Sequence, residues 1–340
     1  MARLDCRAVP TATATRPRVF SGMRPTGQLH IGHFLGALGN WVRLQDEYEC
    51  VYSVVDLHAL TTGYEDVKGI HDAGLEMVAD WVACGVDPDR SIIFRQSDVP
   101  QHAELAVLLG MITPLSWLER VPTYKGQIDE LGDHLQTYGF LGYPLLQTAD
   151  IILYKATRVP VGQDQLPHLE LSREVVRRFN HLYGDVFPEP EAIISQAPLL
   201  LGMDGRKMSK SYGNAITLAS SDEEIDRQVM SMVTDPQRIK KDDPGDPDVC
   251  NVFSWQKLLG ASDAEITEIY EGCTSATLGC VADKRDLAER VKALIRPIRE
   301  RREQLMEDPA RLEAILEQGA ERARAIAGPV MAEATAAMGL

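Results

Sequence analysis

Two histidines near the start of the chain have a spacing that suits phosphate binding. His30 and His33 lie three positions apart, where a β-branched run gives way to a helical pattern. This spacing puts both rings on one side of the first helical turn, where their N–H groups can donate to phosphate oxygens. A helix N-terminus adds unpaired backbone N–H groups and the positive end of its dipole. The segment predicts a polyphosphate site; the alternative is an exposed turn with two incidental histidines.

Two lysines lie far downstream in a glycine-rich loop, residues 202–213. Glycines permit the loop to move, and Lys207 and Lys210 carry positive charge. Ammonium groups that reach a leaving pyrophosphate only in the transition state accelerate cleavage at the α-phosphate of ATP. The loop therefore predicts a mobile catalytic element, and a flexible linker between domains is the alternative. A Walker loop is excluded, because Gln28 and Leu29 follow Gly27 where Lys and Ser or Thr are required.

The elements that must position these residues alternate along the first 200 positions. Apolar, β-branched runs predict strands at 18–21, 50–55, 91–95, 158–161 and 192–196. Longer helical patterns lie between them, near 33–46, 67–84, 101–110, 144–155 and 167–182. This alternation predicts an α/β fold with a Rossmann-like parallel sheet, covered by helices on both faces. Ligands of such sheets bind beyond the carboxyl ends of the strands.

The second half of the chain shows helical patterns only. They lie near 222–234, 253–259, 263–272, 283–306 and 309–327. We therefore predict three regions, which are a flexible tail over 1–17, a catalytic domain over 18–215 and an α-helical C-terminal domain over 216–340. The tail is rich in Thr, Ala and Arg and has no apolar core. This composition argues against a secretory signal and leaves an organelle-targeting segment as the alternative.

Composition excludes some classes of protein. The formal net charge of −15 argues against a protein that coats nucleic acid non-specifically, although a local basic face stays possible. The sequence contains no run of about 18 apolar residues, so we expect no transmembrane helix and a cytoplasmic location.

The two loops together match a pair of family signatures. The first is His30-Ile31-Gly32-His33, and the second is Lys207-Met208-Ser209-Lys210-Ser211. In this order and in an α/β context, they resemble both signatures of the class I aminoacyl-tRNA synthetases. The segments 20–27, 55–61, 142–154 and 159–168 are similar to the tryptophanyl branch, and the likeness covers nearly the whole chain from Arg18. The resemblance implies activation of L-tryptophan by ATP with Mg²⁺, followed by transfer to tRNA(Trp).

The resemblance also implies a role for each site residue. Tryptophan would be bound by Phe20, His58, Tyr143, Gln147, Asp150, Val159, Val161 and Gln165. ATP would be bound by Arg24, Thr26, Gly32, His33, Asp164, Met208 and Lys210. The catalytic groups would be His30, His33, Lys207 and Lys210, with no metal held by protein ligands alone.

Within this set Asp150 would accept the indole N–H, while Phe20, Val159 and Val161 form the apolar wall. Tyr143 and Gln165 would hold the ammonium group. Asp164 would accept from the ATP ribose hydroxyls. The alternatives are an N-cap or a structural ion pair for Asp150, ordinary core positions for Phe20 and the valines, and a local backbone contact for His58.

Two positions depart from the family pattern. Gln147 stands where many relatives have Met, so part of the contact with the ring would be polar. Lys125 resembles a lysine that binds the phosphate tail, but Gln127 stands where its companion is expected. Either change would retune binding and would leave the activation apparatus in place.

The cysteines show no paired framework of a secreted protein. Instead, Cys250, Cys273, Cys280 and Asp283 resemble an iron–sulfur motif of some tryptophanyl-tRNA synthetases, in which the fourth ligand is Cys. Because Asp283 stands in that place, we expect a vestigial or metal-free site.

The family resemblance further implies a homodimer and a C-terminal domain that reads the anticodon. Arg285, Lys292, Arg296 and Arg299 share one helical stripe, which is either a contact for tRNA phosphates or a solvated face. A second candidate patch comprises Arg238, Lys240 and Lys241. Two rival functions stay open: the same reaction with tyrosine, and a paralogue that acts as a binding or regulatory partner.

Overall fold

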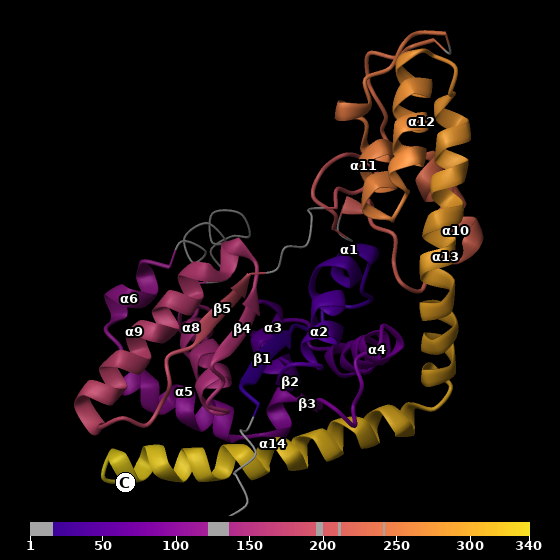
Figure 1. The fold of residues 1–340 in the computed structure, drawn as a ribbon. Coiled ribbons are helices and arrows are strands. Elements are labelled where there is room, and N and C mark those ends of the chain that lie inside the picture. The colour runs from indigo at the N-terminus through magenta and orange to yellow at the C-terminus, as the bar shows by residue number, and fades with distance from the viewer. Residues whose placement is uncertain (1–15, 122–135, 195–199, 210–211, 241) are drawn as a thin grey trace, which may run out of the picture.

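The computed structural model describes residues 16–121, 136–194, 200–209, 212–240 and 242–340 (Figure 1). Its centre is a five-stranded sheet with the order β3-β2-β1-β4-β5. The strands are β1 (Arg18–Met23), β2 (Glu49–Val54), β3 (Ile92–Arg95), β4 (Arg158–Val161) and β5 (Glu191–Ile194). All neighbours pair in parallel. The predicted α/β fold with a Rossmann-like parallel sheet is therefore confirmed, and its strand order reverses between β1 and β4.

Helices cover both faces of this sheet. They are α1 (Ile31–His33), the π-helical stretch η1 (Phe34–Leu38), α2 (Gly39–Leu44), α3 (Asp56–Gly63), α4 (Ile70–Ala83), α5 (Gln101–Ile112), α6 (Leu115–Glu119), α8 (Tyr138–Ile152) and α9 (Leu166–Tyr183). Successive strand residues point to opposite faces. Phe20 therefore packs in a core with α5, α8 and α9, whereas its neighbour Val19 packs in a second core with α2 and α4.

The helices after the sheet project away from it, as Figure 1 shows. They are α10 (Asp222–Met230), α11 (Asn251–Leu258), α12 (Asp263–Thr274) and α13 (Cys280–Met306). They share a core around Trp255 and Leu287, which also includes Ile31 and Met208 from the two loops. The C-terminal end of α13 packs on α4, where Arg302 donates to Asp80 over 2.6 Å and to Glu76 over 3.0 Å.

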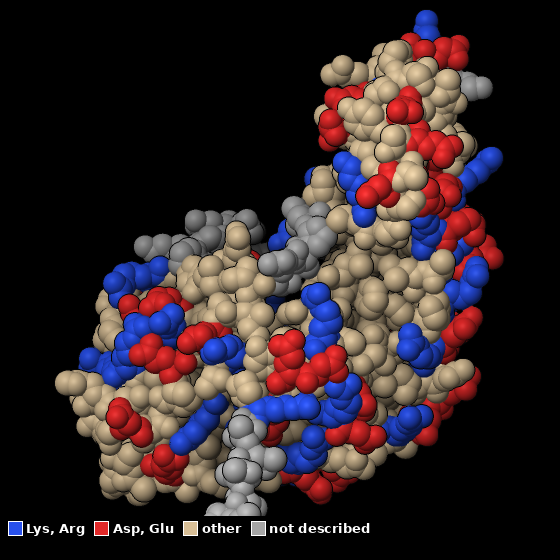
Figure 2. Space-filling model, viewed as in Figure 1, with Lys and Arg blue, Asp and Glu red and all other residues tan. Residues whose placement is uncertain are grey.

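Three of the four cations in the predicted basic stripe on α13 pair with α10, and the fourth, Arg285, is exposed. Lys292 pairs with Asp226 at 2.6 Å. Arg296 and Arg299 both pair with Asp222, at 2.5 and 3.0 Å. These three cations therefore form ion pairs between two helices of the protein. The sequence-based alternatives, a contact for tRNA phosphates and a solvated face, did not include such pairs. On the face shown in Figure 2, acidic and basic side chains of the described residues are interspersed, so an RNA partner would have to be met by local basic groups.

The last helix, α14 (Pro309–Ala337), turns back and lies along the sheet instead of joining the projecting helices (Figure 1). It contacts the edge strand β3, where a β-carbon on Gly319 would lie only 1.7 Å from the backbone oxygen of Ile93. This close approach covers an otherwise open sheet edge. The boundary at residue 216 stays a prediction, but α14 packs with the sheet.

Four helical elements differ clearly from the sequence-based expectation. Helix α8 begins at Tyr138, capped by Thr137, and runs through Pro144. Helix α14 likewise runs through Pro329. Helices α3 and α6 were not predicted at all. Among the described residues, no helix combines the length and apolar character needed to cross a membrane.

Candidate active site

A cleft with about 1160 Å³ of open space lies beyond the carboxyl ends of β1 and β4, where the strand order reverses. This is the expected ligand position in a doubly wound sheet. Its volume exceeds what one small ligand usually needs, so it can hold two small molecules side by side. The predicted residues that line it are Phe20, Arg24, His30, Gly32, His33, His58, Tyr143, Gln147, Asp150, Val159, Val161, Asp164, Gln165, Lys207 and Met208.

The histidine loop is fixed by backbone contacts. The His30 backbone N–H donates to His33 Nδ1 over 3.2 Å, and the two rings lie 3.8 Å apart. Just before them, the Leu29 N–H donates to Asp80 Oδ2 over 3.0 Å. Because Asp80 also pairs with Arg302, the end of α13 and the histidine loop share one buried carboxylate. The helix that follows contains a π-helical stretch, a feature frequent at functional sites.

The lysine loop reaches the same cleft. Its downstream end pairs with the histidine loop, since the Ile31 N–H donates to Ile216 O and the Leu218 N–H donates to Leu29 O, both over 2.9 Å. Lys207 and Met208 line the cleft. Lys210 lies outside the described residues, so its placement stays a prediction.

Asn214 organises the lysine loop from within. Its Nδ2 donates to Asp204 Oδ1 over 2.7 Å and to Lys207 O over 3.2 Å, and its Oδ1 accepts from the Ser209 N–H over 2.8 Å. Hydrogen bonds from Asn214 and from Arg206 lower the pKa of Asp204 to about 2. Asn214 is buried. Asn214 was not predicted from the sequence, although it follows the Lys207–Ser211 signature by three positions.

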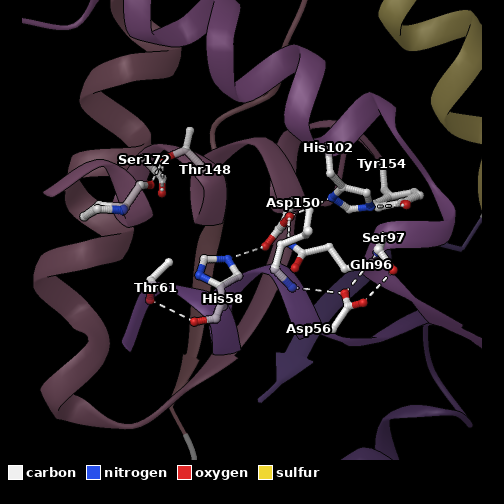
Figure 3. A network of polar contacts seen from close by, with 12 residues as sticks. Asp56, His58, Thr61, Gln96, Ser97, His102, Thr148, Asp150, Tyr154 and Ser172 are labelled. Carbon is white, nitrogen blue, oxygen red and sulfur yellow. Dashed lines mark hydrogen bonds and ion pairs between the residues drawn. The ribbon is translucent and has the colours of Figure 1, made fainter. Parts of the chain in front are cut away.

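Asp150 is buried, lines the cleft and belongs to a hydrogen-bond network (Figure 3). Its Oδ1 accepts from Gln96 Nε2 over 2.7 Å and from His102 Nδ1 over 2.6 Å. Its Oδ2 accepts from His58 Nε2 over 2.9 Å. The second nitrogen of His102 lies 2.7 Å from the hydroxyl of Tyr154. Gln96, His102 and Tyr154 were not predicted from the sequence.

The network keeps Asp150 ionised. Burial opposes ionisation, but hydrogen bonds from His102 and His58 outweigh it and lower the pKa of Asp150 to about 2. The side chain is therefore a carboxylate that only accepts hydrogen bonds. The structure also excludes the alternative of an N-cap, because Asp150 lies near the C-terminal end of α8.

The remaining predicted residues form the wall and mouth of the cleft. Phe20, Val159 and Val161 are buried and line it, so they are core and wall residues at once. Tyr143 bonds His168 Nε2 over 2.5 Å, and burial lowers the pKa of His168. Gln165 Nε2 donates to Asp164 Oδ2 over 3.0 Å.

One described prediction falls outside the cleft lining. Thr26 is exposed on the turn after β1 and does not line the cleft, because the chain turns outward between Met23 and Leu29. Lys125 and Gln127 lie outside the described residues, so the predicted phosphate-tail contact stays a prediction.

The cysteine site does not fit a cluster ligated by four thiolates. Arg238 Nη1 lies 3.8 Å from Cys273 Sγ and 3.7 Å from Cys280 Sγ, so a guanidinium lies against two of the three sulfurs. Asp283, in the place of the fourth thiolate, accepts from Gln256 Nε2 over 2.9 Å. Among the described residues, no group of three or more His, Cys, Asp or Glu side chains is arranged to hold a metal ion.

The fold and the cleft define a parallel α/β protein with a nucleotide-type site at its switch point. A family model described as "tRNA synthetases class I (W and Y)" matches residues 12–296, and the chain belongs to this family. A tryptophan–tRNA ligase of Thermotoga maritima is 50% identical over 95% of this chain and 99% of the relative. One of Aquifex aeolicus is 42% identical over 95% of this chain and 100% of the relative.

A solved structure is similar along the whole chain. The tryptophanyl-tRNA synthetase of Campylobacter jejuni, described as complexed with ADP and tryptophan, has a TM-score of 0.87 at 34% identity. The match covers 95% of this chain and 100% of that chain. Together with the sequence identities, it places this chain in the tryptophanyl branch of the family, as the motifs predicted.

Proposed function

We propose that this chain activates L-tryptophan with ATP, forming tryptophanyl-AMP and pyrophosphate, and then transfers the tryptophanyl group to tRNA(Trp). The observation that carries the proposal is the convergence of three features on one cleft. These are the histidine loop, the lysine loop and an ionised, buried Asp150 opposite them. The identities with tryptophan–tRNA ligases support the same reaction.

Tryptophan would enter the closed end of the cleft. The indole is a large apolar body with a single N–H donor, which matches an apolar wall of Phe20, Val159 and Val161 around one acceptor, Asp150. His58 and Gln147 border the ring, while Tyr143 and Gln165 would hold the ammonium group at the open end. A charge-assisted hydrogen bond to the N–H stabilises binding by about 1.5–3 kcal/mol.

ATP, arriving as its Mg²⁺ complex, would occupy the end formed by the two loops. Gly32 leaves room for a flat base, and Asp164 would accept from the ribose hydroxyls. Arg24 would approach the nucleotide from the turn after β1, whereas a contact with Thr26 would need the turn to move, because Thr26 lies outside the cleft. Met208 would contact it from the lysine loop.

The chemistry needs positioning more than proton transfer. The tryptophan carboxylate attacks the α-phosphorus of ATP, the bond to the bridging oxygen breaks, and pyrophosphate leaves. Because the nucleophile is already an anion, the step requires no general base. His30, His33, Lys207 and Lys210 would stabilise the charge that develops on the phosphates. The terminal adenosine hydroxyl of tRNA then takes the tryptophanyl group and AMP leaves.

The proposal includes a division of labour and an assembly. Residues 1–17 would be a tail, residues 18–215 would bind ATP and tryptophan, and residues 216–340 would contribute the helices that meet the tRNA anticodon. The chain would act in the cytoplasm as a homodimer. Large exposed apolar side chains on α5, α6 and α8 support a contact between copies; they are Val107, Met111, Leu115 and Tyr138.

Exchange of labelled pyrophosphate into ATP tests the activation step, with tryptophan and tyrosine supplied separately. Exchange with tryptophan alone supports the proposal, and charging of tRNA(Trp) then tests the transfer step. Exchange with tyrosine would instead show that tyrosine is the amino acid that the protein activates. A protein without exchange with either amino acid would favour the binding or regulatory role, to which Gln147 in the pocket lends some support.

A further inference from the structure

A chain of hydrogen bonds extends from Asp150 away from the cleft. His102, at the start of α5, is completely buried, with Nδ1 2.6 Å from Asp150 Oδ1 and Nε2 2.7 Å from the Tyr154 hydroxyl (Figure 3). Neither His102 nor Tyr154 lines the cleft. A hydrogen-bonding effect of His102 on a bound ligand therefore has to pass through Asp150.

The hydrogen-bond partners fix which ring nitrogen of His102 carries the proton. A carboxylate only accepts, so the nitrogen that faces Asp150 must donate. In the neutral ring, Nε2 then accepts, and the Tyr154 O–H is the donor that meets it. Burial, with the charge of Asp150 adding to it, raises the pKa of Tyr154 far above its ordinary value. The phenol therefore keeps its proton and can donate it to Nε2 of the neutral His102 ring.

Packing holds the His102 ring in this orientation. The ring stacks on Phe94 at 5.6 Å between centroids, with 28° between the planes. Tyr154 stacks on Phe20 at 5.6 Å and 6°, and Phe20 lines the cleft. All four rings are buried. The orientation of His102 is therefore set by a close-packed aromatic group, which gives the ring little freedom to turn.

The two oxygens of Asp150 are treated differently. Oδ1 receives two donors, from Gln96 and from His102. Among the residues that the structure describes, only His58 donates a hydrogen bond to Oδ2. Since a carboxylate oxygen has two lone pairs, Oδ2 keeps one for a further donor in the cleft. The donors on Oδ1 stop the carboxylate from rotating and so direct that lone pair.

We propose that His102, which is hydrogen-bonded to Tyr154 through its Nε2, is a positioning residue that orients the Asp150 carboxylate and so sets the selectivity for a ring bearing an N–H donor. This inference rests on the proposed function, in which that ring is the indole of tryptophan. The competing explanation is that His102 only fills space in the core. The two explanations predict different results for substitutions of His102. If the residue only fills space, its substitution should weaken the binding of all ligands of the same shape equally.

A matched pair of ligands separates these explanations. L-3-Benzothienylalanine has the shape of tryptophan, but sulfur replaces the indole N–H. The quantity to measure is the selectivity ratio, which is the inhibition constant of this analogue divided by KM for tryptophan in pyrophosphate exchange. Loss of a directed acceptor should weaken tryptophan binding and leave binding of the analogue nearly unchanged.

A matched pair of variants then tests His102. In His102→Gln the amide lies near the position of Nε2, so Asp150 loses its donor, and the selectivity ratio should fall roughly 10- to 100-fold with little change in kcat. In His102→Asn the amide nitrogen lies near the position of Nδ1 and keeps the donor. That variant should hold the ratio within about threefold, although it loses the bond to Tyr154. His181→Gln, at an exposed position of α9, is the control for the substitution itself.

Tyr154→Phe provides a second readout if His102→Gln does not fold. Without the phenol, Nε2 of His102 loses the hydrogen bond that helps to hold the ring, so the selectivity ratio should fall in the same direction by a smaller factor. Equal weakening of both ligands in His102→Gln, or an unchanged ratio in Tyr154→Phe, would overturn the proposal. If the unaltered protein shows no tryptophan-dependent exchange, the proposed function fails, and this outcome is distinct from failure of the His102 inference.

Discussion

Met208 lies over Gly32, with its sulfur 3.5 Å from the position that a β-carbon on Gly32 would take. One residue belongs to the lysine loop and the other to the histidine loop, and backbone bonds between Ile31 and Ile216 hold the two loops together. Lys207 therefore lies at the cleft that the histidines also line. A nucleotide that binds between these loops would either push the Met208 side chain away from Gly32 or pack against that side chain.

Replacement of Lys210 by Ala should slow activation far more than it weakens tryptophan binding. The proposed role of this ammonium group is to meet charge that develops only in the transition state. We expect kcat of pyrophosphate exchange to fall at least roughly 100-fold, with KM for tryptophan nearly unchanged. Lys68→Ala, at an exposed position far from the loop, is the control. Equal losses in kcat and in tryptophan affinity would contradict this role.

Asn214→Ala should have a similar but smaller effect. Asn214 ties the backbone at Lys207 and Ser209 to Asp204, so its loss frees the lysine loop without removing a lysine. Poorer positioning should lower kcat by about 10-fold, while KM for tryptophan serves as the internal control. A variant that exchanges at the full rate would show that the loop is positioned by other contacts.

Replacement of Asp150 by Asn should raise KM for tryptophan by roughly 10- to 100-fold. The amide can place its NH₂ group in the position of Oδ1, where it faces the donors Gln96 and His102, or in the position of Oδ2, where it faces His58 and the indole N–H. In either orientation, at least one donor faces another donor, and that contact is repulsive. Asp72→Asn, on the exposed face of α4, should leave KM unchanged. If Asp150→Asn and the unaltered protein bind tryptophan alike, Asp150 is a structural group and not the acceptor of the indole.

The same variant tests how Asp150 contributes to the free energy of unfolding at different pH values. The folded-state pKa of Asp150 is lowered to about 2, from an ordinary value of 3.8. A depressed carboxyl pKa contributes stability that is fully present above the ordinary value and is lost as the pH falls through the folded value. The difference in unfolding free energy between the unaltered protein and Asp150→Asn should therefore be constant near neutral pH and shrink below pH 3.8. Urea unfolding at several pH values measures this difference, and a gap that widens in acid would contradict the assignment.

The parallel sheet could be predicted because its strands are short and rich in β-branched residues. The predicted strand 158–161 coincides with β4. Helix ends were harder, since Pro144 and Pro329 suggest boundaries in a sequence yet lie inside α8 and α14. A proline within a helix removes one backbone bond, and tertiary packing can offset that loss. Helix α3 was missed because it starts directly at the end of a strand, with no break in composition.

The site was predictable where chemistry is concentrated in short motifs. The histidine loop, the lysine loop and the segment around Asp150 carry their own signals in the sequence. Gln96 and His102 do not, because they lie after β3, and only the sheet order brings the end of β3 close to α8. A residue that acts through such a tertiary contact has no local pattern by which a single sequence could reveal it.

From the arrangement of the cysteine site, we expect that the purified protein carries no stoichiometric iron–sulfur cluster. Arg238 lies against Cys273 and Cys280, and Asp283 is held by Gln256 where a fourth thiolate would be needed. Iron and sulfide analysis of anaerobically purified protein should give well under one cluster per chain. Asp283→Cys supplies the missing thiolate and should take up more iron than the unaltered protein. A full complement of iron and sulfide in the unaltered protein would contradict this prediction.

Two glycines of α14 offer a matched test of how the last helix holds the sheet. A β-carbon on Gly319 would lie 1.7 Å from the backbone oxygen of Ile93 and 2.5 Å from its carbonyl carbon, whereas a β-carbon on Gly328 would meet nothing within 4 Å. Backbone atoms cannot move aside by changing rotamer. Gly319→Ala should therefore push α14 off β3 and destabilise the protein by at least about 1–3 kcal/mol.

Gly328→Ala should have the opposite sign. Alanine favours a helix over glycine by about 1 kcal/mol, and this position has room for the methyl group. Urea unfolding of both variants measures the contrast. Because Gln96 follows β3 directly and donates to Asp150, a displaced β3 should also raise KM for tryptophan in Gly319→Ala and leave it unchanged in Gly328→Ala. Equal stabilities of the two variants would mean that α14 is not held against β3 in solution.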